Sequence, residues 1–384
     1  MPRKNEQRYD EEEDYDYDPR YDRQMKYANE SGKCCSWTKF CVFILFLGGA
    51  LGAIFGLIDI EEIRGFFTGS STSGGTDSGG GDTEVVDTTP YVFMQCVEGE
   101  ECCNGFASNC DLRVNELMYA TVHNANHDDI LVPNHEAPLE GALEAGYRGL
   151  MLDVCYCTNA ETQAMEITFC HGLCGLGTRD PLEVFSNIDD FLTANPTELL
   201  VIEFEISAGS PTTDQLWSVM KQDDGIKRKT YTHDGGEWPT LRENLAAGKQ
   251  IIAFQHNGDA HVRIGSFFTY AVETPWTFSN VADVENTAYS CKFDRGSNGA
   301  LEWYSVNNFV TATFGPSKSS ADEINEKSFV EQRIADCENL TGLKPNLVSV
   351  DFWQRGDLPE VAQEENKKRR PKKRRNRFLS WLMG

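Results

Sequence analysis

The chain has 384 residues, of which 40% are hydrophobic, and its formal net charge at pH 7 is −25. This length suffices for one large domain with tails or for two small domains, and the hydrophobic content suffices for a sizeable core. So acidic a surface repels phosphate groups, which excludes a nucleic-acid-binding protein.

An uncharged apolar run near the N-terminus predicts a membrane helix. Residues 1–39 mix acidic and basic side chains without apolar periodicity, which predicts a disordered tail. Residues 40–58, FCVFILFLGGALGAIFGLI, are long enough to cross a bilayer as a transmembrane helix. We favour a retained helix over a cleaved signal peptide, because the polar segment before it is long and the apolar run exceeds a typical signal core.

The charges that flank this run predict its orientation. Lys33 and Lys39 precede it, whereas Asp59, Glu61 and Glu62 follow it. Because positive charge stays on the cytoplasmic side, we expect a single-pass protein with a cytoplasmic N-terminus and a lumenal or extracellular remainder. Residues 59–95 include a stretch rich in Gly, Ser and Thr and are predicted to be a flexible linker.

Cysteine is frequent after the apolar run. An even number of cysteines on one side of a membrane predicts disulfides in an oxidising compartment. Cys103–Cys110 and Cys170–Cys174 are the local pairs that we expect. A zinc site is the alternative, but the cysteine spacings do not match the usual zinc ligands. The cysteines concerned are Cys96, Cys102, Cys103, Cys110, Cys155, Cys157, Cys170, Cys174, Cys291 and Cys337.

Residues 96–366 are predicted to form one globular domain in which strands and helices alternate. This alternation predicts an α/β fold, either a TIM-type (β/α) barrel or a doubly wound sheet. The expected strands cover residues 117–122, 148–154, 166–169, 199–206, 250–254 and 347–352. The expected helices cover residues 138–145, 181–194, 240–247 and 319–340.

Polar side chains gather at the ends of the expected strands. His123 and Asn124 follow the first strand, Asp153 lies in the second, His171 follows the third and Glu205 lies in the fourth. In a β/α barrel these ends form the active site, and two histidines suit a base and an acid in a two-step proton transfer. Carboxylates and an amide oxygen are ligands for calcium. The alternative for each residue is an ordinary polar side chain with its hydrogen bonds satisfied.

Six segments resemble, in order and spacing, the X domain of phosphatidylinositol-specific phospholipase C, and most closely its secreted and plant-type branch. The resemblance covers about residues 100–360 and implies a distorted β/α barrel, which can be incomplete. The segments are CCNGFASNCDLRVNE from Cys102, VHNANHDD from Val122, GYRGLMLDVCY from Gly146, FCHGLCGLG from Phe169, LLVIEFEI from Leu199 and PNLVSVDFWQRGDL from Pro345.

The resemblance implies a role for each strand-end residue. His123 matches the general base that deprotonates the inositol 2-hydroxyl, and His171 matches the general acid for the leaving alcohol. Asn124, Asp153 and Glu205 match calcium ligands of the intracellular eukaryotic enzymes. The chain is therefore expected to be a phosphoric diester hydrolase that acts at a membrane on phosphatidylinositol-like or GPI-like lipids.

One departure concerns the metal. The calcium-dependent enzymes have Glu where this chain has Met151, and a thioether is a poor ligand for a hard cation. Calcium is then held by fewer carboxylates, or Glu203 substitutes, or no cofactor is used. The alternative for Glu203 is a solvated or salt-bridged side chain.

Two other functions compete with this interpretation. A glycerophosphodiesterase or sphingomyelinase-like phosphodiesterase shares a barrel with paired histidines, but Met151 breaks the Glu-x-Asp pair of those enzymes. A catalytically inactive barrel that binds lipid or sugar is the second, and retention of both His123 and His171 counts against it.

The C-terminal residues 367–384 combine a basic run, KKRRPKKRRNR, with the apolar FLSWLMG. This combination predicts docking on an anionic lipid surface. A solvated tail, a protease cleavage site and a nuclear-localisation look-alike are the alternatives.

Overall fold

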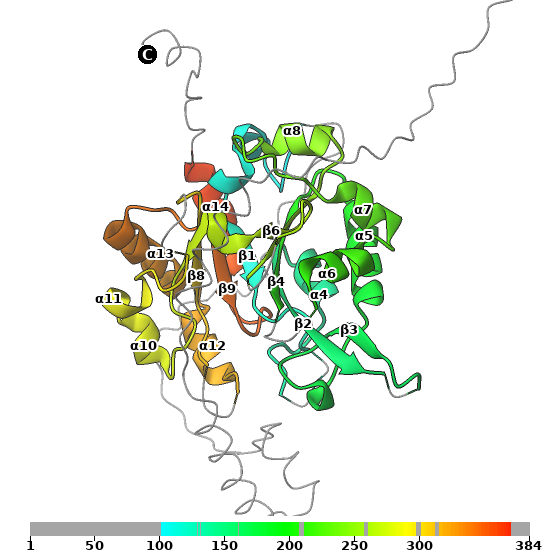
Figure 1. Cartoon of the computed structure of the whole chain (residues 1–384). Helices are drawn as coiled ribbons and strands as arrows, with labels where there is room; N and C mark the ends of the chain where they lie inside the picture. Colours follow the sequence, from blue (N-terminus) through cyan, green and yellow to red (C-terminus); the bar gives the residue numbers. More distant parts are fainter. Residues whose placement is uncertain are drawn as a thin grey trace, which may run out of the picture. The chain divides into compact units, whose positions relative to one another are not determined.

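The computed structural model describes residues 101–369, apart from 129, 131, 160, 207–210, 257–259, 297–300 and 312–314 (Figure 1). The predicted tail 1–39, the predicted transmembrane helix 40–58, the linker 59–95 and residues 370–384 lie outside this range. Among the described residues, no helix has both the length and the apolar character needed to span a bilayer.

A curved sheet forms the centre of the domain (Figure 1). Its strands follow the order β6-β5-β4-β2-β1-β9-β8-β7, and β3 pairs with β2. The β2–β3 pairing is antiparallel, and the other seven ladders among the described strands are parallel. The strands are β1 (Tyr119–Val122), β2 (Gly149–Thr158), β3 (Met165–Phe169), β4 (Leu200–Ile206), β5 (Ile251–Gln255), β6 (Gly265–Ser266), β7 (Ala271–Glu273), β8 (Trp303–Asn307) and β9 (Leu347–Val350).

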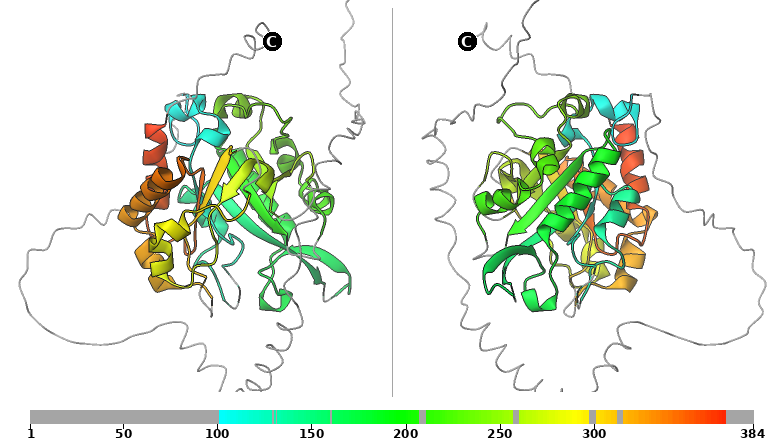
Figure 2. Two further views of the ribbon diagram at one scale, coloured as in Figure 1. Left: turned by 60° about the vertical axis from the view of Figure 1, so that its left-hand side comes forward. Right: turned by 90° about the vertical axis from the view of Figure 1, so that its right-hand side faces the viewer.

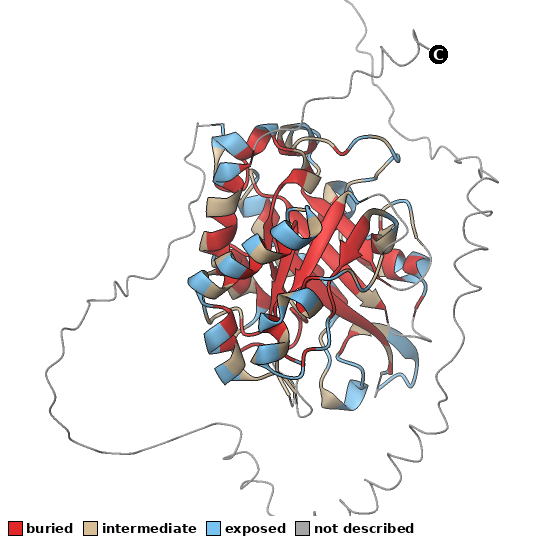
Figure 3. Ribbon diagram, turned by 90° about the vertical axis from the view of Figure 1, so that its left-hand side faces the viewer, coloured by how far each residue is buried: buried red, intermediate tan, exposed pale blue. Residues whose placement is uncertain are grey.

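Helices cover the outer face of the sheet and expose their own outer sides (Figures 2 and 3). In α5, Asp180 accepts a hydrogen bond from Leu182 N–H and Pro181 occupies the first turn, so the helix begins where the sequence predicts. The helices are α4 (Leu139–Glu144), α5 (Pro181–Ala194), α6 (Thr213–Met220), α7 (Asp224–Lys229), α8 (Leu241–Ala246), α9 (Phe267–Tyr270), α10 (Val281–Glu285), α11 (Thr287–Ser290), α12 (Lys318–Ile324), α13 (Lys327–Thr341) and α14 (Leu358–Lys368), with short 3-10 turns at Ala107–Asp111, Val114–Glu116 and Cys174–Leu176.

Alternation along the strands divides their side chains between two environments. In β2, Leu150 and Leu152 belong to the hydrophobic core beneath the helices. Met151 and Asp153 therefore point to the opposite, inner face of the sheet, because successive side chains of a strand alternate. The same alternation places the predicted site residues of β2 and β4 on the inner face.

The sheet curves far enough to bring distant strands together. Four strands lie between β5 and β8 in the sheet order, yet the ring centroids of Phe254 in β5 and Trp303 in β8 are 5.4 Å apart. No ladder joins β6 to β7 in the described part of the chain. The prediction of an α/β fold with a barrel-like parallel sheet is confirmed, and the sheet is an open half-barrel rather than a closed one.

The inner face changes from apolar to polar toward the carboxyl ends of the strands. The apolar layer contains Tyr119, Leu199, Val201, Ile252, Phe254, Trp303 and Leu347. Next come two pairs with buried carboxylates, Glu203–His256 at 2.7 Å and Glu273–Arg295 at 2.5 Å. This polar layer lies directly beneath the strand ends that carry the site.

The helix expected over residues 319–340 is broken, which corrects the prediction. It is two helices, α12 and α13, separated at Asn325 and Glu326. The Asn325 side chain donates a hydrogen bond to Asp351 O at 2.8 Å. The break therefore places an amide against the strand end of β9, a long-range contact that helical periodicity does not report.

Every cysteine in the described range is disulfide-bonded, as expected. Cys103–Cys110 is confirmed, but the predicted Cys170–Cys174 pair is wrong. Instead, Cys155–Cys170 and Cys157–Cys174 join β2 to the end of β3, and we call these two bonds the hairpin disulfides. β2 continues beyond the predicted residue 154 as an antiparallel hairpin with β3, which brings its cysteines close to the loop that follows β3. Cys291–Cys337 joins α11 to α13.

The basic segment begins inside the domain rather than as a separate tail. α14 extends to Lys368, and Lys367 lies over the ring of Phe106, 4.7 Å from its centroid. Arg369 is buried and donates to Glu116 O at 2.9 Å. Lys367, Lys368 and Arg369 therefore contribute to the domain, although the predicted boundary lies at residue 366.

Candidate active site

His123 lies directly after β1, and a carboxylate that follows β9 fixes its orientation. Its Nδ1 is 2.9 Å from Asp351 Oδ1, and its backbone N–H donates to Val350 O. The imidazole stacks on Phe309 with 3.7 Å between the ring centroids. Because the Asp351 carboxylate accepts a hydrogen bond from Nδ1–H, the proton of the neutral ring is on Nδ1. Nε2 then carries the lone pair that a general base needs.

A second histidine, His127, lies in the loop after β1 and is completely buried. Its Nδ1 is 3.3 Å from Asn134 Oδ1, and Asn134 Nδ2 donates to Asp351 Oδ1 at 2.8 Å. Burial, and next the charge of His171, lower the pKa of His127 to about 2. The imidazole of His127 is therefore neutral near pH 7.

A third buried histidine supports the backbone of the site. His135 Nε2 lies 2.6 Å from the carbonyl oxygen of His123, to which it donates. The backbone N–H of Trp353 donates to His135 Nδ1 at 3.5 Å. Burial lowers the pKa of His135 to about 4, so this side chain is also neutral near pH 7.

Acid should unfold the protein partly through these neutral histidines. A folded pKa of about 4 for His135, below the usual 6.5, stabilises the fold fully above pH 6.5, and this stabilisation is lost as the pH falls toward 4. Between pH 7 and pH 4, we expect the unfolding free energy of wild type to fall by about 3 kcal/mol more than that of His135→Gln. Urea unfolding at both pH values measures this, and equal losses in the two proteins would contradict the assignment.

His171 follows β3 in the loop that the hairpin disulfides hold. Its ring centroid is 4.7 Å from that of His127. The side chain is exposed on one side, but the protein around it removes part of its hydration. This desolvation, and next the charge of His123, lower the pKa of His171. The loop packs against the loop after β1 at Gly177, whose φ is 136° and whose added Cβ would lie 2.4 Å from Ile130 Cγ2. The structure thus brings His123 and His171 to one site.

Two carboxylates adjoin these histidines. Asp153 and Glu205 are register neighbours on β2 and β4, and both point to the inner face. Burial, and next the negative charge of Glu205, raise the pKa of Asp153 well above its usual value. Asn124, which follows His123, is buried and has a left-handed φ of 49° that asparagine tolerates.

These oxygen donors fit a hard divalent cation in their chemistry. Calcium prefers carboxylate and amide oxygens, and two neighbouring carboxylates supply the negative charge that such an ion neutralises. Met151 is the register neighbour of Glu203, not of Glu205. Glu203 is completely buried and bonded to His256, so it is salt-bridged rather than solvated, and this pairing counts against its acting as a substitute ligand.

Several residues of this site were not predicted from the sequence. They are His127, Asn134, His135, Phe309 and Asp351. Asp351 lies near the end of the expected strand 347–352, so strand-end reasoning of the kind that identified His123 applies to it as well. His127 lies within the motif VHNANHDD, but its burial beside Asp153 and His171 depends on the fold.

The protein is thus an α/β half-barrel with a candidate acid–base site at its strand ends. Two imidazoles form this site, and a carboxylate orients one of them. The sequence profile of the PI-PLC X family matches residues 109–366. The chain belongs to this family.

Individual relatives share about a quarter of their aligned residues with this chain. PI-PLC X domain-containing protein 1 of Arthroderma benhamiae is 25% identical over 287 residues, and the match covers 69% of this chain and 89% of that protein. A PI-PLC X domain-containing protein of Arabidopsis thaliana is 24% identical, with 64% of this chain and 60% of that protein covered. Among solved structures, the F249X mutant of phosphatidylinositol-specific phospholipase C from Staphylococcus aureus matches with a TM-score of 0.47 and 14% identity, covering 66% of this chain and 94% of that chain.

Proposed function

We propose that this protein is a phosphoric diester hydrolase that cleaves phosphatidylinositol-like or GPI-like lipids, with His123 as general base and His171 as general acid. The observation that carries the proposal is the hydrogen bond between His123 Nδ1 and Asp351, which leaves Nε2 free to accept a proton. Membership of the PI-PLC X family supports the same substrate class.

The proposed reaction has two proton transfers. His123 Nε2 takes the proton of a nucleophilic hydroxyl, whose oxygen then forms a bond to phosphorus. The bond from phosphorus to the lipid alcohol breaks, and His171 donates its proton to the departing oxygen. With an inositol head group the neighbouring hydroxyl is the nucleophile, so the first product is a cyclic phosphate and a lipid alcohol.

A divalent cation is part of the proposal. When bound, it would neutralise negative charge that develops on the phosphate oxygens. Asn124, Asp153 and Glu205 would hold it, and calcium matches these oxygen donors best. The competing arrangement is a direct contact of Asp153 and Glu205 with a basic group near the phosphate.

Substrate class and cation are tested in one assay. Full-length protein in mixed micelles is given phosphatidylinositol, a GPI-anchored protein, glycerophosphoinositol or sphingomyelin, and ³¹P NMR identifies the product. We expect a cyclic phosphate from the inositol lipids, loss of activity with EDTA and recovery with calcium.

Other outcomes of this assay identify the alternatives. Preferred hydrolysis of glycerophosphoinositol or sphingomyelin would favour the glycerophosphodiesterase-like or sphingomyelinase-like function. No turnover of any substrate would favour an inactive lipid-binding or sugar-binding protein. Full activity in EDTA would remove the cation from the proposal.

A further inference from the structure

His127 presents an unused nitrogen to the candidate site. The side chain is completely buried, and its Nε2 has no hydrogen-bond partner among the described residues. A buried polar atom without a hydrogen bond is costly, so a ligand or ion that satisfies it stabilises the protein.

The neighbours of His127 determine which ring nitrogen bears the proton. Asn134 Nδ2 donates to the carboxylate of Asp351 at 2.8 Å, so Asn134 Oδ1 faces the other way. This oxygen is an acceptor and lies 3.3 Å from His127 Nδ1, which must therefore be protonated. In the neutral ring, Nε2 then carries a lone pair.

This lone pair faces two further donor groups. His127 Nε2 lies 3.9 Å from Asp153 Oδ2, which is too long for a hydrogen bond. One donor atom each from His127, Asp153 and His171 lies within 4.8 Å of the other two. Ligands about 2.0–2.2 Å from one tetrahedral ion are separated by roughly 3.3–3.6 Å, so the set closes when the His127–Asp153 distance shortens slightly and the exposed His171 loop moves toward both residues.

We propose that His127, Asp153 and His171 form a site for a divalent transition metal of the zinc type, whose occupancy inhibits the hydrolase. Two imidazoles and one carboxylate are the ligand types of zinc, whereas calcium takes oxygen ligands. A hydrogen bond to the second nitrogen of a ligating histidine, such as that from His127 Nδ1 to Asn134, is the usual support for such a site.

The inhibitory effect rests on the proposed function of His171. A histidine that ligates a metal through either nitrogen cannot become the imidazolium, so the ion removes the general acid. Asp153 is common to the zinc and calcium donor sets, so zinc also displaces calcium. Another cluster of possible ligands, Cys157, Cys170 and Cys174, is consumed by the hairpin disulfides.

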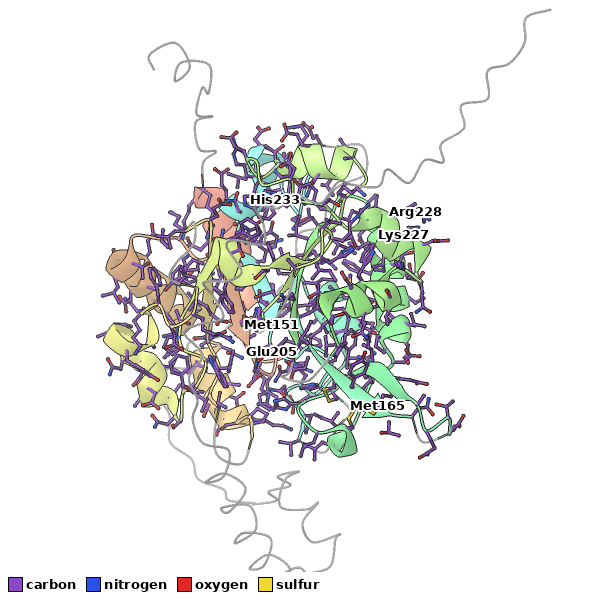
Figure 4. All side chains as sticks on the ribbon, in the orientation of Figure 1. Met151, Met165, Glu205, Lys227, Arg228 and His233 are labelled. Atoms are coloured by element: carbon purple, nitrogen blue, oxygen red, sulfur yellow. A yellow bond between two sulfur atoms is a disulfide. The ribbon has the colours of Figure 1, made fainter. Side chains whose placement is uncertain are left out.

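Binding is measured first, without any substrate. Full-length protein, purified in EDTA, freed of the chelator and kept without reductant, is titrated with zinc chloride by calorimetry and with Co²⁺ by absorption in the visible range. Wild type is compared with His127→Gln, with Asp153→Asn and with the control His233→Gln. His233 lies apart from Met151 and Glu205, toward the upper side of the domain in Figure 4, and it stacks on Trp238.

The proposal expects one zinc ion per wild-type chain, an intense visible Co²⁺ spectrum and affinity unchanged in His233→Gln. Loss of a ligand should weaken zinc binding at least about 100-fold in both other variants. Circular dichroism confirms which variants are folded. Folded His127→Gln or Asp153→Asn with wild-type zinc affinity would overturn the site, as would a wild-type affinity for zinc no higher than for calcium.

Inhibition is measured second, as the ratio of activities with and without zinc within each protein. We expect this ratio to fall at least tenfold further in wild type than in His127→Gln. Zinc binding without inhibition, or with activation, would overturn the inhibitory role. If no substrate is turned over at all, the proposed function fails while the binding experiment still decides the metal site.

Discussion

Replacing His123 or His171 by alanine is expected to lower kcat by about 10²–10⁴-fold, because each change removes one proton-transfer role. The two imidazoles follow different strands. His123 is hydrogen-bonded to Asp351, whereas His171 lies beside His127. The matched control is His233→Ala, which lies apart from Met151 and Glu205 (Figure 4) and should keep the wild-type rate.

A change of substrate distinguishes the base from the acid. A p-nitrophenyl phosphodiester of inositol has a leaving group that departs without a proton. We expect this substrate to restore most of the activity of His171→Ala and none of that of His123→Ala. Near wild-type turnover of the natural substrate by either variant would show that the acid–base assignment is wrong.

Replacing Asp351 by asparagine is expected to lower kcat by about 10²–10⁴-fold, because the carboxylate orients the general base His123. The carboxylate accepts from His123 Nδ1 and from Asn134 Nδ2. An asparagine in its place can present an N–H to His123, which favours the tautomer that carries its proton on Nε2. The base would then lack its lone pair.

The test of this role needs a measurement beyond activity. ¹⁵N chemical shifts of His123 report which nitrogen is protonated, and we expect the proton to move from Nδ1 to Nε2 in Asp351→Asn. Asp322→Asn is the control, since Asp322 is an exposed carboxylate of α12 that pairs with Arg355. An unchanged tautomer together with reduced activity would mean that Asp351 acts in another way.

Local signals in the sequence determined the fold class, the start of α5 and several residues of the site. An aspartate before a proline predicted the start of α5, and the alternation of strands and helices predicted the α/β fold. Parallel strands end at one edge of a sheet, so His123, Asp153 and Glu205 could be assigned to one site before any contact was known. Cys103–Cys110 could be predicted because the two cysteines are only seven positions apart in the sequence.

Contacts between distant segments were decided by the tertiary structure alone. His123 and Asp351 are 228 residues apart in the sequence, and no local pattern joins them. The hairpin disulfides follow from the antiparallel register of β2 and β3, whereas spacing suggested the nearer pair Cys170–Cys174. The lone pair of His127 depends on Asn134, whose orientation depends on Asp351. Such a chain of hydrogen bonds exists only when the loop after β1 and the end of β9 are packed together, and therefore periodicity and composition carry no trace of it.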